Sequence, residues 1–383
     1  MVQRILKTDI LYTSAGRPIE NGMLAIDEHD RIVSVGTSLR EEGVAIEYFK
    51  GALCPGFVNT HCHLELSHLV GQVTKETGLN GFIQELQKLR AAKEIEIQEA
   101  IKEADRKMSS SGIVAVGDIS NGNSTFETKQ QSSIQYHTFV ELFGFDKSQA
   151  DSILERGKQL KTQYANHQLA ASIIPHSPYS VSRELFELIS QQQNNTPLSI
   201  HNQETEAENE MYQTGKGKMI EMLQSFGLDT STFEVRGKTS LLSYLSLLPS
   251  DSPLLLVHNT FTSKEDIEVA ESIHNQLFWC FCPKANLYIE NRLPNILQFI
   301  EAGVKCTLGT DSLASNDSLS IWEEIATIQE HYPDIVLETL LEWATINGAQ
   351  FLGIEKDYGS FEVGKRAAVN WINGGGLTPL VLK

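Results

Sequence analysis

Short apolar runs alternate with longer amphipathic stretches through the middle of the chain, from about residue 53 to 354. Runs bounded by turn residues indicate buried strands, and apolar positions that recur every three or four residues indicate helices, as over Phe82–Met108. The first strand candidate begins at Phe57, and the others are Ile113–Ile119, Tyr136–Leu142, Ala170–Pro175, Pro197–His201, Pro253–His258, Leu277–Phe281 and Val304–Leu308. Eight strands separated by helices predict an α/β fold, a (β/α)8 TIM barrel with its chemistry at the carboxyl ends of the strands.

The two ends of the chain have a different pattern, with short runs and frequent turns. Three runs near the N-terminus predict an antiparallel β unit: Ile5–Thr13, Gly22–Ile26 and Ile32–Val35. This unit is too small to hold a core alone, and the run Ala367–Ile372 near the C-terminus is its natural partner. We therefore expect a small composite β-sandwich domain of residues 1–52 plus 355–383, beside a barrel domain of residues 53–354.

The composition excludes several classes of protein. The protein has a net charge of −18 and a pI near 5.1, so it would repel nucleic-acid phosphates and anionic lipids. We therefore expect no nucleic-acid partner. The sequence has no run of about 18 apolar residues, so it predicts no membrane span. The first residues lack the features of a signal peptide. Five cysteines without paired disulfide spacing fit a reducing compartment, and we expect a cytoplasmic protein.

Polar residues that can carry chemistry close most of the predicted barrel strands. They are, in chain order, His61 and His63, Asp118, Glu141, His176, His201, His258 and Asp311. Five of the 11 histidines fall on these few positions. Because the carboxyl ends of barrel strands meet at one face, we expect these side chains to form one site.

His61 and His63 are two residues apart at a strand end, so both imidazoles point to the same side. With His201 and Asp311 they predict a site of three imidazoles and one carboxylate, which suits zinc or iron(II) and leaves a position for water. No lysine closes the fourth strand to bridge a second metal, so we expect one ion. Each of these residues could also have a purely structural role, such as a helix cap for Asp311 or an imidazole hydrogen-bonded to backbone for His258. All of these structural roles would have to apply at once for the site to be absent.

Four segments, taken in order, resemble the amidohydrolase superfamily. They are Pro-Gly-Phe-Val-Asn-Thr-His-Cys-His-Leu-Glu-Leu-Ser, Ser-Ile-His-Asn-Gln-Glu-Thr, Leu-Val-His-Asn-Thr and Leu-Gly-Thr-Asp-Ser-Leu-Ala-Ser. Within it the chain most resembles the cytosine, guanine and adenosine deaminases and the triazine hydrolases, over nearly its whole length. The tail departs from the family pattern, reading Ala-Ala-Val-Asn at residues 367–370.

The resemblance implies a role for each matching residue. His61, His63, His201 and Asp311 would hold one divalent ion, with zinc favoured over iron. Glu204 would be the proton shuttle, and His258 would orient the attacking water. The chemistry agrees, because Glu204 follows His201 by three residues and one carboxyl group can take a proton from water and deliver it to substrate. The alternative for Glu204 is a solvated loop residue in an acidic stretch.

Residues near these ligands are candidates for substrate contacts. Glu65 and Ser67 follow the metal strand, and the Leu-Glu-Leu-Ser continuation resembles aminodeoxyfutalosine and adenosine-type deaminases. His176 resembles a position that contacts the sugar or base, although a structural histidine between two prolines is an equal alternative. Asn286 could reach a distal part of the substrate, as could Arg292. The roles of Asp118, Glu141 and Arg292 stay open.

The leading hypothesis is a metal-dependent aminohydrolase that removes ammonia from a heterocyclic amine, a purine nucleoside or related derivative. The alternative is hydrolysis of a ring amide, or of a triazine or imidazolone carbon–nitrogen or carbon–chlorine bond. A third hypothesis is a non-enzymatic scaffold. It is disfavoured because every expected metal ligand is present in the sequence. The expected partner is a small-molecule substrate, with a homodimer as the default assembly.

Overall fold

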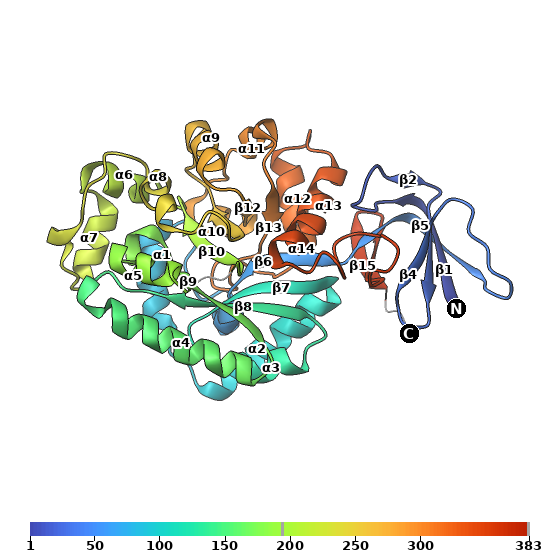
Figure 1. Ribbon diagram of the computed structural model, residues 1–383, viewed down its shortest axis with the longest axis horizontal. Helices are drawn as coiled ribbons and strands as arrows, with labels where there is room; N and C mark the ends of the chain where they lie inside the picture. Colours follow the sequence, from blue (N-terminus) through green and yellow to red (C-terminus); the bar gives the residue numbers. More distant parts are fainter. Residues whose placement is uncertain (193–194, 381–383) are drawn as a thin grey trace.

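The computed structural model describes residues 1–192 and 195–380, and its central part consists of parallel strands with helices between them (Figure 1). The strands are β6 (Phe57–Cys62), β7 (Ile113–Ser120), β8 (Gln135–Leu142), β9 (Ala170–Pro175), β10 (Leu198–Asn202), β11 (Leu254–His258), β12 (Leu277–Phe281) and β13 (Cys306–Leu308). Each overlaps one strand candidate of the sequence, so the apolar runs located them correctly.

These strands form two parallel sheets, in the orders β6-β7-β8-β9 and β10-β11-β12-β13. Backbone contacts join the sheets at both edges. The N–H of His201 on β10 donates to the carbonyl of His176 after β9 at 3.0 Å. On the other side, Cys62 of β6 and Asp311 after β13 form an isolated parallel bridge. The carboxyl ends of both sheets therefore lie close together, and this is where the site forms.

Helices connect the strands and cover the outside of the two sheets (Figure 1). Their bounds are α1 (Gly78–Leu89), α2 (Glu94–Ser110), α3 (Phe126–Gln131), α4 (Ala150–Asn166), α5 (Arg183–Ser190), α6 (Glu206–Thr214), α7 (Lys218–Ser225), α8 (Ser240–Tyr244), α9 (Lys264–Ile273), α10 (Pro283–Glu290), α11 (Ile296–Ala302), α12 (Ile321–His331), α13 (Leu337–Ala344) and α14 (Ile346–Leu352). Short 3-10 turns are η1 (Leu64–Leu69), η2 (Lys147–Gln149), η3 (Pro178–Ser180), η4 (Thr230–Thr232) and η5 (Leu245–Leu247).

The helical segment predicted over Phe82–Met108 forms two helices, because α1 ends at Leu89 and α2 begins at Glu94. Arg90 ends α1, and its guanidinium donates to Glu65 Oε1 at 2.9 Å and to Asn121 Oδ1 at 3.0 Å. These contacts with residues after β6 and β7 override the helix-forming composition of the segment.

The two ends of the chain share one sheet, which lies at one end of the long axis with both termini (Figure 1). Its strands are β1 (Val2–Leu11), β2 (Ile19–Glu20), β3 (Met23–Asp27), β4 (Ile32–Gly36), β5 (Ile46–Pro55), β14 (Val369–Asn373) and β15 (Gly376–Leu380). The sequence missed β5, which pairs parallel with β1 and antiparallel with β14, so a purely antiparallel unit was wrong. The described strands form a single seven-stranded sheet, and the sandwich stays a prediction.

Separate apolar clusters support this arrangement. The largest fills the space among the parallel strands and their helices, with fully buried side chains such as Phe139, Trp279 and Phe351. Another covers one face of the terminal sheet and includes Leu6, Leu53 and Phe361. Burial of this apolar surface holds the strand ends in place around the polar site.

Candidate metal centre

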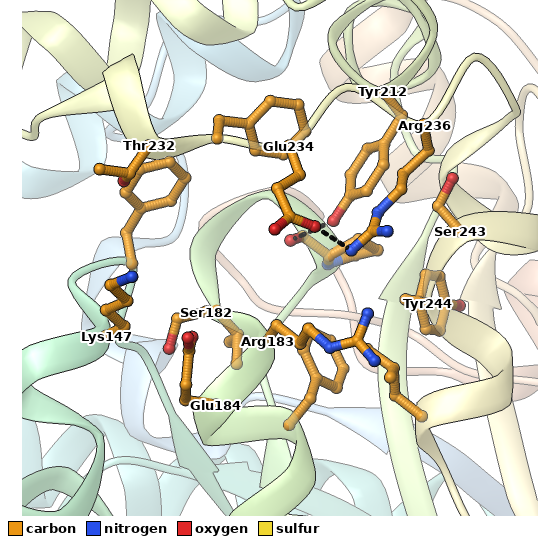
Figure 2. A pocket seen from close by; sticks show the side chains of 16 residues that line it. Lys147, Ser182, Arg183, Glu184, Tyr212, Thr232, Glu234, Arg236, Ser243 and Tyr244 are labelled. Carbon is orange, nitrogen blue, oxygen red and sulfur yellow. Dashed lines mark hydrogen bonds and ion pairs between the residues drawn. The ribbon is translucent and has the colours of Figure 1, made fainter.

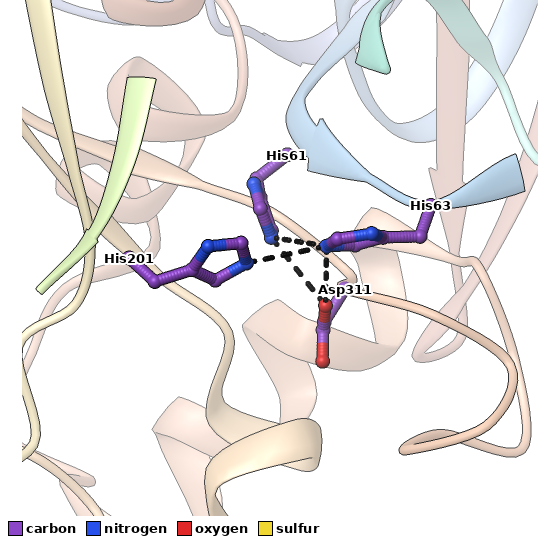
Figure 3. A group of neighbouring side chains, drawn as sticks. All are labelled: His61, His63, His201 and Asp311. Atoms are coloured by element: carbon purple, nitrogen blue, oxygen red, sulfur yellow. Dashed lines mark hydrogen bonds and ion pairs between the residues drawn. The ribbon is translucent and has the colours of Figure 1, made fainter. Parts of the chain in front are cut away.

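The four predicted ligand residues come together at the carboxyl ends of the strands (Figure 3). His61 lies in β6 and His63 follows it, His201 lies in β10, and Asp311 comes shortly after β13. The Nε2 atom of His63 is 3.2 Å from Nε2 of His61, 3.3 Å from Nε2 of His201 and 3.3 Å from Oδ1 of Asp311. The same Asp311 oxygen is 3.4 Å from Nε2 of His61.

These separations fit one small cation. A tetrahedral zinc ion with ligand bonds of about 2.0–2.1 Å would hold its ligand atoms about 3.3 Å apart. The four ligand atoms all lie within 4.8 Å of one another. Three imidazole nitrogens and one carboxylate oxygen are also a donor set that zinc and iron(II) accept.

Backbone contacts bring Asp311 to His61. The carbonyl oxygen of His61 accepts from the N–H groups of Thr310 at 3.0 Å and Asp311 at 3.1 Å. A Cβ at Gly309 would lie 2.8 Å from Cβ of His61, so a larger residue could not approach in this way. Asp311 has a φ of 55°, which costs a non-glycine residue energy and is common at functional sites. The hydroxyl of Ser315 donates to Oδ2 of Asp311, which leaves Oδ1 toward the histidines.

Burial sets the protonation of this cluster. It lowers the pKa of His61 and His63 well below the usual value, and it lowers the pKa of His201. The imidazoles are therefore neutral, as metal ligands must be. Burial alone would raise the pKa of Asp311, but His63, His258 and the Ser315 hydroxyl outweigh it and the pKa is lowered. Asp311 is thus ionised at neutral pH.

Glu204 and His258 lie against the cluster. Oε1 of Glu204 is 3.6 Å from Nε2 of His258, and both side chains are buried. The His258 ring stacks on the His201 ring, with centroids 5.5 Å apart. Burial, reinforced by the charge of Asp311, raises the pKa of Glu204 well above its usual range. Two groups that can hold or pass a proton therefore adjoin the ligands.

Asn286 contacts His258. It lies on α10 and is 1% exposed, and its Nδ2 is 2.8 Å from Oγ1 of Thr260 and 3.3 Å from Nδ1 of His258. The sequence pointed to Asn286 as a substrate contact. Its nearest polar partners are instead on the strand-end segment that carries His258.

The other candidate substrate residues have protein partners as well. Glu65 is buried and accepts from Arg90 at 2.9 Å and from the N–H of Asn121 at 2.9 Å. The hydroxyl of Ser67 donates to the carbonyl of Leu64 at 2.7 Å. His176 is half-buried, its Nδ1 bonds to serine hydroxyls, and its ring centroid is 4.7 Å from that of His201. Among these residues, His176 is the one in direct contact with a candidate ligand.

Glu141 lies behind His201. Its Oε2 accepts from Asn121 Nδ2 at 3.0 Å, and its Oε1 is 3.6 Å from Nδ1 of His201. Glu141, His176 and His201 form a second group of ligand-type side chains. However, Nδ1 of His201 already lies 2.8 Å from the carbonyl oxygen of His176 and donates to it. The backbone N–H of His201 donates to the same carbonyl oxygen. The hydrogen bond from Nδ1 orients the His201 ring toward His61, His63 and Asp311, as outer partners do in metal sites.

Asp118 forms a buried ion pair that the sequence did not reveal. Its Oδ2 is 2.6 Å from Nζ of Lys129, and both side chains are fully buried. Its Oδ1 accepts from the N–H of Leu64, directly after His63, at 2.8 Å. The short polar helix around Lys129 gives no sequence sign of burial. Arg292, whose role was left open, stacks over the ring of Phe261 at 4.5 Å.

A separate pocket lies beside α5 and α8, lined by aromatic and charged side chains (Figure 2). Its arginines are paired, Arg236 with Glu234 at 2.5 Å and Arg183 with Glu187 at 2.9 Å. Tyr212, also in its wall, donates to the carbonyl of Pro178 at 2.8 Å. The pocket contains none of the candidate ligands, so the chemistry is to be sought at the cluster of Figure 3.

Known proteins of similar sequence include deaminases. The chain is 30% identical over 380 residues to a 5-methylthioadenosine/S-adenosylhomocysteine deaminase of Bacillus cytotoxicus, covering 91% of this chain and 80% of that protein. The enzyme of the same name from Bacillus cereus is 30% identical over 382 residues, with the same coverage.

Solved structures share the fold. Aminofutalosine deaminase of Helicobacter pylori, in complex with methylthio-coformycin, aligns with a TM-score of 0.80 at 24% identity, over 96% of this chain and 91% of that one. An adenosine deaminase from Xanthomonas campestris with bound zinc aligns with a TM-score of 0.74 at 21% identity, over 96% and 84%.

The fold consists of parallel strands and helices, with a cluster of metal-ligand side chains at the carboxyl ends of the strands. The amidohydrolase family model matches residues 52–380, and the chain belongs to this family of metal-dependent hydrolases. Within residues 1–192 and 195–380, no helix is both long and apolar enough to cross a bilayer.

Proposed function

We propose that this protein is a metal-dependent deaminase that hydrolyses the amino group of a 6-aminopurine nucleoside carrying a 5′ substituent. The cluster of His61, His63, His201 and Asp311, with Glu204 beside it, is the observation that carries the proposal. The names of the Bacillus relatives support the substrate class.

We propose one divalent ion, zinc in first place and iron(II) as the alternative, held by His61, His63, His201 and Asp311. The separations of 3.2 to 3.4 Å between ligand atoms support zinc. When bound, such an ion lowers the pKa of water to about 7 and makes hydroxide available at neutral pH.

The residues of the chain handle the protons of the reaction. Net hydrolysis adds water at the amino-bearing carbon of the ring and releases ammonia, leaving a carbonyl. Glu204 takes a proton from the water and delivers it to the ring nitrogen. The remaining proton of that water, released as the carbonyl forms, converts the amino group into ammonia. His258, 3.6 Å from Glu204, orients the water, and the raised pKa of Glu204 suits a group that must hold a proton.

We also propose that the two parallel sheets close into one (β/α)8 barrel. The hydrogen bonds from His201 to His176, and from Asp311 to His61, support closure at the carboxyl ends. The proposed division places this barrel at residues 53–354 and a small composite β-sandwich at 1–52 plus 355–383.

A screen for released ammonia tests the function. Zinc-loaded and iron-loaded protein would be offered adenosine, 5′-methylthioadenosine, S-adenosylhomocysteine, guanine, cytosine and a chlorotriazine. We expect ammonia from the 5′-substituted adenosines, with Glu204→Gln as the matched inactive control. Chloride release from the triazine, without ammonia from any purine, would instead support the alternative reaction class.

A further inference from the structure

The ring of His258 is held on both sides by buried polar groups. Its Nε2 faces Oε1 of Glu204 at 3.6 Å, and its Nδ1 faces Nδ2 of Asn286 at 3.3 Å. The backbone of His258 has a φ of 75°, an unfavourable conformation for a non-glycine residue that persists only where the surroundings enforce it. The position and the orientation of this imidazole are therefore both imposed by its neighbours.

Asn286 has the chemistry to decide which ring nitrogen carries the proton. Its amide nitrogen bears two hydrogens, and Oγ1 of Thr260 lies 2.8 Å from that nitrogen. The second hydrogen is then available to Nδ1 of His258, which must offer its lone pair to accept it. A neutral imidazole has one N–H and one lone pair, so the proton would be on Nε2.

The opposite side of the ring accommodates the same tautomer. An N–H at Nε2 would point toward Oε1 of Glu204, a carboxyl oxygen 3.6 Å away that can accept it. Asn286 lies on α10 and is 1% exposed, and its Nδ2 contacts Nδ1 of His258 and Oγ1 of Thr260.

We infer that Asn286, anchored by Thr260, is a positioning residue that fixes His258 in the tautomer with its proton on Nε2. This inference rests on the proposed function for its catalytic meaning, because only that tautomer presents a donor to the water and to Glu204. The sequence suggested a substrate contact for Asn286, and the geometry assigns it this different task.

The tautomer can be read directly by NMR of protein labelled with nitrogen-15 at histidine. The spectrum of the full chain, recorded with and without zinc, distinguishes a protonated from an unprotonated ring nitrogen. Loss of a signal in His258→Gln identifies the resonance of His258. We expect protonated Nε2 and unprotonated Nδ1 in the unmodified protein, and the reverse arrangement would overturn the inference without any variant.

Asn286→Asp provides the test by substitution. A carboxylate in place of the amide would attract a proton to Nδ1, so the His258 pattern should invert. With a substrate found by the ammonia screen, kcat should fall about 100-fold while KM and zinc content change little. Thr260→Val removes the anchor and should give a smaller loss of kcat of the same kind.

Asn291→Asp is the matched control, since it makes the same chemical change at an exposed position that caps the same helix. It should leave the His258 spectrum and kcat unchanged. An unaltered His258 spectrum in Asn286→Asp would overturn the positioning role. This readout needs no substrate, so a failed ammonia screen would count against the proposed function and not against the tautomer.

Discussion

Glu204 and His258 lie 3.6 Å apart, Oε1 to Nε2; both side chains are buried, and the His258 ring stacks on the ring of His201. This pairing places a carboxyl group of raised pKa next to an imidazole of lowered pKa. Burial is the first cause of both shifts, since it disfavours the charged form of each group. Burial therefore favours a neutral carboxyl group and a neutral imidazole before substrate binds.

Glu204→Gln should retain the metal and lose most of the turnover. The amide keeps the size of the side chain but cannot pass a proton, and general acid–base catalysis contributes about 10²–10⁴-fold. The measurements are kcat for ammonia release and metal content by elemental analysis. Full turnover in this variant would remove the proton-shuttle role from Glu204.

His201→Ala should lose bound metal, because Nε2 of His201 is 3.3 Å from Nε2 of His63 at the ligand cluster. The control is His176→Ala, which removes a neighbouring imidazole that contributes no ligand to the cluster of Figure 3. Zinc affinity by calorimetry should fall sharply in the first variant and stay near that of the unmodified chain in the second. Equal affinities in the two variants would contradict the assignment of His201.

Lys129→Met should destabilise the protein because it leaves the charge of Asp118 buried and unpaired. Both side chains of this pair are fully buried, and breaking such a pair costs about 3–5 kcal/mol of unfolding free energy. The double variant Asp118→Asn with Lys129→Met removes the charge and keeps an oxygen for the N–H of Leu64, so it should regain most of that loss. Urea unfolding measures both, and a double variant no more stable than the single one would argue against the pair.

Glu208→Gln should flatten the dependence of stability on pH. Burial raises the pKa of Glu208 to about 7, above an unfolded value of about 4.3. The protonated carboxyl group of Glu208 therefore contributes its full stabilisation below about pH 4. This contribution to the free energy of unfolding, on the order of 3 kcal/mol, is lost as the pH rises to and through 7.

The test is the free energy of unfolding in urea between about pH 5 and pH 8. Gln at position 208 can still accept from the N–H of Gln203 and the hydroxyl of Ser240. Glu206→Gln changes an exposed glutamate on the same helix and should keep the original slope. A slope in Glu208→Gln as steep as that of the unmodified protein would contradict the raised pKa.

Local sequence patterns located the parallel strands and the residues at their ends. A buried strand and the polar residue that closes it are neighbours in sequence, so Ala170–Pro175 and His176 could be recognised together. Convergence of His61, His63, His201 and Asp311 then followed from the shared direction of the strands.

Contacts between distant segments could not be predicted in this way. The parallel pairing of β1 with β5, the break at Arg90 and the burial of Lys129 all depend on partners far along the chain. Asn286 was recognised as notable, but its contact with His258 depends on how α10 packs against the end of β11. A pattern marks which residues are unusual, and packing decides what they touch.

The most direct test of this account is a titration of metal-stripped protein with zinc, followed by ammonia release from a 5′-substituted adenosine. We predict that activity rises from zero and saturates at one zinc per chain, and that Asp311→Asn and His61→Ala neither bind zinc tightly nor release ammonia. Full activity in the metal-free chain, or zinc-dependent activity that survives loss of His61, would contradict it.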